Sequence, residues 1–395
     1  MRKWLSLPVL PFAFLFVAFM RWNPWYLIRI GEIWSNRIGH LIGNTEAYLS
    51  ERDNGFHPEN SYDIWFNIGK PCNKVVAGKY ASLLHMWPAW FCIMVIKVNC
   101  LFRGWEKNLV KPAQVERDIY NLWKKPHIGF TASEEKNGRL LLENLGISGK
   151  WVCLIVRDSS YLAAKFKGDF SYHNYRDAEL EPYAAAVLGL VQRGYTVVRM
   201  GEIVQRPFPL KHSKVIDYAG SEYQCNFGDL YLGAKCEFCI GTPTGFMMIP
   251  QAFQRPLVMT DFVPIEYFTT SVKGLIIWKH HVKDGKRLSI QEIVDAGVSM
   301  SLQTGEFQRA GVTLENNSSS EIYDVAMEMC DLLDVNVCCQ DQSEFWNHYP
   351  RSYANGKPLH GEIKVRIGRE FLNARLQDNC AAGHQGAEPH QRVAV

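Results

Sequence analysis

The feature that most constrains this chain is the regular alternation of short apolar segments and amphipathic segments in its second half. Apolar runs that end in polar or small residues lie at 150–158, 195–201, 214–220 and 236–241. The intervening segments 177–194 and 226–236 have helical character, and Gly194 suits the end of the first helix. Strand, helix and strand in repetition predict a parallel sheet with helices on both faces.

The first half shows the same rhythm less regularly, with strand candidates at 25–31 and 62–69 and helix candidates at 41–52 and 75–86. A polar, glycine-punctuated stretch at 133–150 is typical of a boundary. A chain of 395 residues, 47% of them hydrophobic and 21% charged, can bury two cores. We therefore predict two α/β domains, 25–145 and 146–377, with a hydrophobic segment before them and a disordered polar tail at 378–395.

Residues 1–24 contain an uncharged stretch from Trp4 to Met20, bounded by basic residues on both sides. Pro8 and Pro11 interrupt it, and it is slightly short for a membrane-spanning helix. It lacks a small-residue cleavage site, which disfavours a signal peptide. The flanking tryptophans suit a lipid headgroup zone, so two readings stay open: a segment that contacts the membrane, or a helix that covers the core.

The net charge and the cysteine spacing disfavour a nucleic-acid-binding protein and a zinc protein. The net charge is +3 and the basic residues are spread along the chain, so no nucleic-acid partner is expected. Cys236 and Cys239 fall on opposite faces of one predicted strand, and no Cys/His set with zinc spacing completes them or the pair at 338–339. Most of the eleven cysteines are expected to be reduced and buried, as in a cytoplasmic protein.

Polar residues follow each predicted strand of the second half, and ligands of such sheets bind outside the carboxyl ends of the strands. These candidate positions are Arg157, Asp158, Arg199, Gly201, Asp217, Tyr218 and the turn 241–245. In that turn two glycines permit a tight backbone and Thr242 and Thr244 offer hydroxyls, while the helix that follows presents its amino end. We expect an anion there, although Thr244 as a simple helix cap is an equally ordinary explanation. Pro250 must fall in the first turn of that helix or kink it.

Several familiar motifs are absent from the sequence. There is no phosphate-binding GxxxxGK[ST] loop, no strand followed by GxGxxG, no HExxH and no Asp-x-Asp. The last absence disfavours transferases that hold a sugar diphosphate through a divalent cation. What remains is a metal-independent enzyme, without a cofactor, that neutralises a diphosphate with basic side chains.

A family resemblance rests on an ordered series of segments. "NRIGHLIGNTEAYL", "IVRDSSYL", "YHNYRDAELEPYAAAVLGLVQRGYTVVRMG", "VIDYAGSE" and "CIGTPTGFMMIPQAFQRPLV" together resemble a family of bacterial glycosyltransferases of capsule and lipopolysaccharide biosynthesis, over residues 27–295. More distantly, the last segment is similar to the donor loop of heptosyltransferases, and the "VRD" and "HNYRD" pair to the basic motif of fucosyltransferases. Both comparisons imply the GT-B fold, two facing Rossmann-like domains with the nucleotide sugar held mainly by the second. Ile155 departs from the family pattern where a histidine is expected, and Thr244 stands where serine is expected.

The resemblance implies roles for individual residues. Arg157, Arg176 and Arg199 would face the diphosphate, with help from His173 and from the turn residues Thr242, Thr244 and Gly245. Arginine suits this work because its fork binds two oxygens at once, but each arginine also has an alternative role as a structural ion-pair partner. Asp217 and Tyr218 would hold the ribose or base, and Lys279 the donor phosphate or sugar. The general base is left open between Asp158, His40 and Glu46, with His40 slightly favoured for contact with the acceptor.

The function that the sequence predicts is transfer of a hexosyl or deoxyhexosyl group from a nucleotide sugar to a surface-polysaccharide or lipid-linked acceptor. The expected location is the cytoplasm, at the inner face of the cytoplasmic membrane. Two alternatives remain: a non-catalytic nucleotide- or sugar-binding protein of the same fold, and a phosphorylase or epimerase that shares it.

Overall fold

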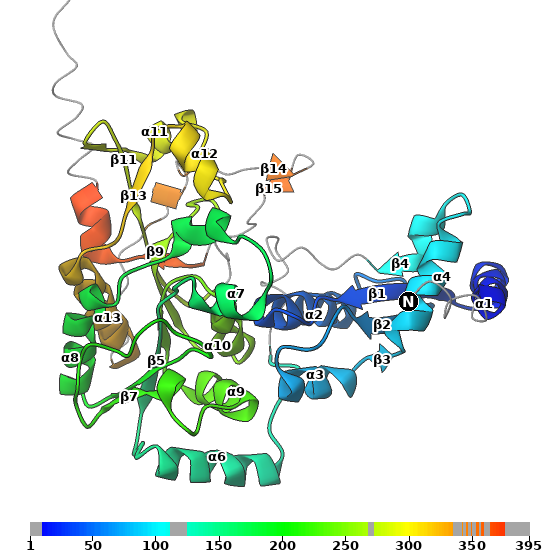
Figure 1. Cartoon of the computed structure of the whole chain (residues 1–395), viewed down its shortest axis with the longest axis horizontal. Helices are drawn as coiled ribbons and strands as arrows, with labels where there is room; N and C mark the ends of the chain where they lie inside the picture. The colour runs from blue at the N-terminus through cyan, green and yellow to red at the C-terminus, as the bar shows by residue number, and fades with distance from the viewer. Residues whose placement is uncertain are drawn as a thin grey trace, which may run out of the picture.

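A computed structural model describes residues 10–110, 125–267 and 272–334, together with 342, 345–346, 349, 353–354, 357–358 and 364–375. The described part of the chain forms two α/β units (Figure 1). The predicted tail at 378–395 and the cysteine pair at 338–339 lie outside the described residues.

The second unit is built on a seven-stranded parallel sheet in the order β16-β10-β9-β8-β5-β6-β7. Its strands are β5 (Trp151–Ile155), β6 (Thr196–Arg199), β7 (Val215–Asp217), β8 (Cys239–Gly241), β9 (Leu257–Phe262), β10 (Gly274–Trp278) and β16 (Arg366–Ile367). The chain winds outward from β5 in one direction to β7, then returns to β8 on the other side of β5. The order of strands therefore reverses between β5 and β8, where doubly wound sheets bind ligands.

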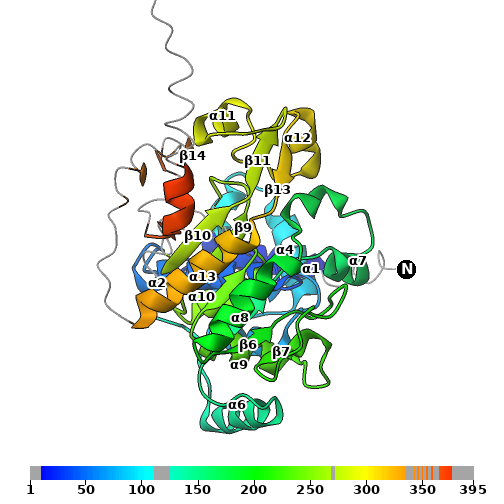
Figure 2. The same ribbon diagram turned by 90° about the vertical axis from the view of Figure 1, so that its left-hand side faces the viewer.

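Helices cover both faces of this sheet. On one face α8 (Ala184–Gln192) lies beside α13 (Ser319–Asp334) (Figure 2), and on the other α9 (Asn226–Lys235) lies beside α10 (Met248–Ala252). The central strands β5, β8 and β9 are buried along their whole length, as expected for a sheet covered on both sides. Shorter helical pieces connect the strands: α7 (Ser160–Lys165), η2 (Ser171–Arg176), η3 (Glu181–Tyr183), η4 (Tyr218–Gly220) and η5 (Gly245–Met247).

Beyond β10 the chain forms a small antiparallel sheet that the sequence analysis did not predict. It pairs β11 (His280–Lys283) with β12 (Lys286–Arg287) and β13 (Thr313–Glu315), next to α11 (Ile290–Asp295) and α12 (Thr304–Arg309). The turn between β11 and β12 is Asp284-Gly285, and both residues have positive φ. A second short hairpin joins β14 (Tyr353–Ala354) and β15 (Lys357–Pro358).

The first unit has a smaller parallel sheet in the order β3-β2-β1-β4. Its strands are β1 (Leu27–Ile33), β2 (Ser61–Asn67), β3 (His85–Met86) and β4 (Leu109–Val110), connected by α2 (Ile38–Asp53), α3 (Lys74–Ala81), α4 (Ala89–Asn99) and η1 (Trp105–Asn108). The prediction of an α/β protein with two parallel sheets is thus confirmed.

Residues 10–22 form α1 (Leu10–Trp22), which packs along α4. Ala13, Val17 and Met20 are buried in this contact, so part of the hydrophobic segment does cover the core. Arg21 fixes the end of the helix by donating to Asn99 Oδ1 at 3.0 Å and to the carbonyl of Arg103 at 2.7 Å. None of the helices in the described ranges combines the length and the apolar character that crossing a membrane requires.

The two units meet where α2 packs against α10 and η5. A shared apolar cluster includes Leu41 and Ile42 from α2 with Ile249 and Ala252 from α10. Helix α6 (Ala132–Asn144) bonds to α9, because Tyr231 donates to Glu135 at 3.1 Å. Helix α6, which precedes residue 145, thus contacts the second unit. The domain boundary near residue 145 stays a prediction.

Candidate functional site

The carboxyl ends of β5 and β8 are joined at the reversal of the strand order. The Thr242 hydroxyl accepts the main-chain N–H of Arg157 at 2.7 Å, and Thr242 is fully buried. Gly241 has φ +142°, and a Cβ there would lie 1.8 Å from the carbonyl oxygen of Ile155. Thr242 therefore holds the two strand ends together, and the chain leaving β5 carries the Arg157 side chain beside the turn 241–245.

Thr244 occupies the N-cap position of η5, but its hydroxyl makes no capping hydrogen bond. The Thr244 Oγ1 atom is buried and has no hydrogen-bond partner among the described residues. The capping explanation for Thr244 is therefore not what the structure shows. A buried hydroxyl without a partner is costly unless a ligand satisfies it.

The helix after this turn is short. A single 3₁₀ turn, η5, precedes the five-residue α10, and Pro250 falls in the first turn of α10, where a missing N–H costs little. So short a helix carries a small dipole. The positive charge at this site must come mainly from side chains.

Segment η2 brings two of the predicted basic residues to the same place. Arg157 Nε lies 3.0 Å from Asp177 Oδ1, while Arg157 Nη2, Arg176 Nε and His173 Nδ1 are buried without hydrogen-bond partners among the described residues. Burial, together with the charges of Arg176 and Arg157, lowers the pKa of His173 to about 4. Burial and the nearby Arg176 also lower the pKa of Arg157. These shifts mark a region with an excess of positive charge.

The first unit contributes the amino end of α2. Gly39 and Gly245 touch, since a Cβ on Gly245 would lie 2.9 Å from the Gly39 nitrogen. Arg37 immediately precedes α2, and its guanidinium lies 5.6 Å from the ring centroid of Phe166 in the second unit. Arg37 was not among the residues predicted from the sequence, because nothing in its local pattern separates it from other arginines.

His40 lies in the first turn of α2, and this corrects the prediction that it stands in a loop before the helix. Its ring packs edge-on against Trp34, with centroids 5.3 Å apart, and it stays half-buried. Burial lowers the pKa of His40, and the charges of Arg37 and Arg176 lower it further. A neutral, partly accessible imidazole beside the basic cluster can accept a proton.

The other two base candidates have structural partners. Asp158 Oδ1 accepts the N–H of Ser160 and Oδ2 accepts that of Gln205, both at 2.9 Å. Glu46 is fully buried, accepts the Tyr80 hydroxyl at 2.8 Å and contacts His127 Nδ1. Both carboxylates are thus bonded within the fold, whereas the His40 ring bonds to Asn44 and lies among the charges of Arg37 and Arg176, which favours His40 among the three.

Arg199 and Asp217 form an ion pair at the ends of β6 and β7. Arg199 Nη1 lies 3.1 Å from Asp217 Oδ1 and also donates to the carbonyl of Arg206, and Arg199 is only 1% exposed. Nearby, Tyr218 is fully buried and accepts the N–H of Cys225, while Gly201 has φ +148°. This arrangement fits the structural alternative for Arg199, although its Nε and Nη2 atoms have no hydrogen-bond partners among the described residues.

We expect Arg199→Ala to lower stability more than turnover. Removing the guanidinium takes the ion pair from Asp217, which keeps the N–H of Phe208, and leaves the Arg206 carbonyl without its donor, so the free energy of unfolding should fall by about 1–3 kcal/mol. Urea denaturation followed by circular dichroism measures this loss. An unchanged unfolding midpoint together with lost turnover would instead place Arg199 on the ligand.

Lys279 lies between β10 and β11 and is buried. Its ammonium donates to the carbonyl of Asp177 at 2.5 Å, and burial lowers its pKa. Lys279 thus ties the far end of η2 to the sheet beside Arg157. A capping box of Ser289 and Glu292 begins α11.

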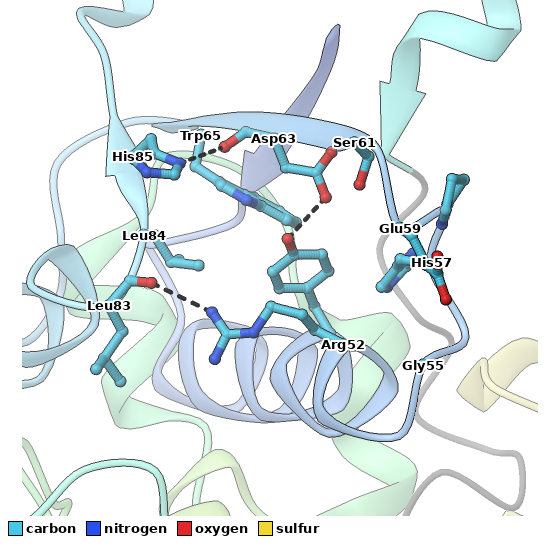
Figure 3. A pocket seen from close by; sticks show the side chains of 12 residues that line it. Arg52, Gly55, His57, Glu59, Ser61, Asp63, Trp65, Leu83, Leu84 and His85 are labelled. Carbon is cyan, nitrogen blue, oxygen red and sulfur yellow. Dashed lines mark hydrogen bonds between the residues drawn. The ribbon is translucent and has the colours of Figure 1, made fainter. Parts of the chain in front are cut away.

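A separate cavity of about 290 Å³ lies at the other end of α2 from His40 (Figure 3). Its central carboxylate, Asp63, accepts Arg29 Nε and the Tyr48 hydroxyl, both at 2.7 Å. Arg52 donates to the carbonyl of Leu83 at 3.4 Å across the opening. These contacts join β1 to β2, and α2 to β2 and to the segment before β3, and the candidate active site does not include the cavity.

No group of three or more His, Cys, Asp or Glu residues is placed to hold a metal ion within the described ranges. Metal independence stays a prediction.

Comparison with known proteins finds no matching family model and no matching curated protein. Among solved structures, the chain is similar to a glycosyl transferase family 9 protein from Veillonella parvula, with 12% identity and a TM-score of 0.45 over 78% of this chain and 98% of that one. It is also similar to ADP-heptose lps heptosyltransferase II from E. coli, with 12% identity and a TM-score of 0.37 over 63% and 91%. Similarity of this size identifies neither a family nor an activity.

Proposed function

We propose that this chain is a glycosyltransferase that moves a sugar from a nucleotide-sugar donor to a hydroxyl of a surface-polysaccharide or lipid-linked acceptor. The observation that carries the proposal is the set of buried polar atoms without partners on Arg157, Arg176, His173 and Thr244. They come from three separate segments and gather where the strand order reverses. A diphosphate supplies enough acceptor oxygens to satisfy all of them.

In the proposed reaction the acceptor oxygen attacks the anomeric carbon as the bond from that carbon to the diphosphate oxygen breaks. The electron pair of the broken bond leaves with the nucleoside diphosphate, whose growing charge Arg157 and Arg176 stabilise. Donors already in position for such charge usually provide the largest part of the rate acceleration. His173, neutral near pH 7, and Thr244 would donate hydrogen bonds to the same group.

His40 takes the proton of the acceptor hydroxyl in this mechanism. It stands on the first unit, and burial, together with the charges of Arg37 and Arg176, lowers its pKa. Because its pKa is below 6.5, the base form predominates at neutral pH. A hexosyl or deoxyhexosyl donor, metal independence and a cytoplasmic location are further parts of the proposal.

The test is a panel of nucleotide sugars with a mixture of polysaccharide and lipid-linked acceptors, with and without a chelator. Acceptor-dependent release of nucleoside diphosphate that survives the chelator supports the proposal. Binding without release would favour a non-catalytic binding protein, and conversion of the donor without acceptor an epimerase. Loss of activity with the chelator would contradict the metal-independent chemistry.

A further inference from the structure

Helix α1 has an apolar stripe that points away from the protein. Its buried positions, Ala13, Val17 and Met20, face α4, while a second stripe repeats at intervals of three and four residues on the outer side. The outer stripe consists of Phe12, Leu15, Phe19 and Trp22, which are 66%, 69%, 54% and 83% exposed. We call these four residues the outer face of α1. Large side chains exposed in a row mark a site of interaction.

The surroundings of the outer face extend its apolar and aromatic character. Trp25 and Tyr26 follow α1 and are 72% and 57% exposed, and Trp90 is exposed on α4. Tryptophan and tyrosine are the side chains that favour the boundary between lipid headgroups and acyl chains. Helix α1 lies at the end of the molecule far from the second unit (Figure 1), so a flat surface can reach this face without touching that unit.

The charged residues near α1 indicate which kind of surface can bind the outer face. The first 31 residues contain no Asp or Glu, and Arg21 ends α1 beside Arg103. Lys97 and Lys107 are exposed on and just beyond α4, with Glu106 the one acidic residue between 89 and 110. An apolar helical face with cations and few carboxylates in its own and neighbouring segments suits binding to an anionic membrane in the plane of the interface.

We propose that the outer face of α1 rests on an anionic lipid bilayer, with α1 parallel to the membrane plane. Helix α1 packs on α4, and Arg21 hydrogen-bonds to Asn99 at the end of α4. The outer face is therefore exposed in the folded protein, and no part of the chain has to unfold for it to meet the lipid. The lipid surface would hold the first unit beside a lipid-linked acceptor. Membrane binding itself needs no sugar donor, so its test is independent of the proposed function.

The test is co-sedimentation of the full chain with vesicles of phosphatidylethanolamine and phosphatidylglycerol, compared with vesicles of phosphatidylcholine alone. We expect the wild type to bind the anionic vesicles and to bind phosphatidylcholine far more weakly. The triple variant Phe12→Ser, Leu15→Ser, Phe19→Ser should bind the anionic vesicles at least about tenfold more weakly, because three apolar side chains no longer enter the lipid.

A matched control replaces two exposed leucines outside α1, Leu140→Ser on α6 and Leu302→Ser before α12, which are 47% and 43% exposed. The control should bind vesicles like the wild type, and both variants should keep the wild-type unfolding midpoint. Unchanged binding by the triple variant would overturn the proposal, as would equal binding to phosphatidylcholine. A wild-type dimer that the triple variant converts to monomer, without vesicle binding by either, would assign the outer face to a second copy of the chain.

Discussion

Replacing Arg157 with alanine is expected to lower kcat by about 10²–10³-fold, the usual effect of removing one preorganised donor from a developing oxyanion. Arg157 Nη2 is buried without a hydrogen-bond partner, so the folded protein gains little from that atom. The ion pair with Asp177 is lost in the variant, but Asp177 keeps the nearby charge of Lys279. Steady-state kinetics and a thermal melt of the same sample separate the two effects.

Arg206→Ala is the matched control. Arg206 is exposed and pairs with Glu179 at 3.1 Å and Glu181 at 2.6 Å, and surface pairs of this kind contribute about 0–1 kcal/mol. It should keep both turnover and melting temperature. If the Arg157→Ala protein is unfolded, or if it turns over substrate at the wild-type rate, then Arg157 is a structural ion-pair partner and the diphosphate assignment fails.

Replacing His40 with glutamine is expected to lower kcat by about 10²–10⁴-fold, the range for loss of a positioned general base. Burial and the charges of Arg37 and Arg176 lower the pKa of His40, so the wild-type rate should fall on the acidic side only below pH 6.5. His40 can act as a base only when it is deprotonated, so activity is present above its pKa and is lost below it. The pH profile of kcat measures this limb.

His40→Gln should abolish that acidic limb as well as reduce the rate, and donor binding should change little because His40 belongs to the first unit. A limb that persists in the variant would assign the titration to another group. Asp158→Asn and Glu46→Gln are the comparison variants, since Asp158 and Glu46 are bonded within the fold. A larger rate loss in either, without loss of stability, would move the base to that residue.

The sheets were predictable because their signals are local. Buried runs such as Trp151–Ile155 have no helical period, and the residues after them are the polar positions that such sheets place at one edge. The capping box at Ser289 is likewise a short-range pattern. The antiparallel hairpin after Trp278 was missed, although Asp284-Gly285 is a recognised hairpin turn.

The partners of the site residues could not be predicted, because they depend on contacts between distant segments. Nothing near Arg199 in sequence reveals that Asp217 takes its guanidinium, and nothing near Glu46 reveals His127, which is 81 residues away. The same holds for Arg37, which reaches the site only because α2 packs against η5. Only the tertiary structure therefore shows which basic residues have polar atoms without hydrogen-bond partners and which have structural partners.

The central claim is that Arg157, Arg176, His173 and Thr244 hold a nucleoside diphosphate. It is tested most directly by thermal shift with UDP, GDP and dTDP on the wild type and on the Arg157→Ala/Arg176→Ala double variant. A ligand that binds only the folded state raises the melting temperature, by an amount that grows with its concentration relative to Kd. One nucleotide should stabilise the wild type and leave the folded double variant unshifted. Stabilisation by none of them, or an equal shift in the double variant, would contradict the account.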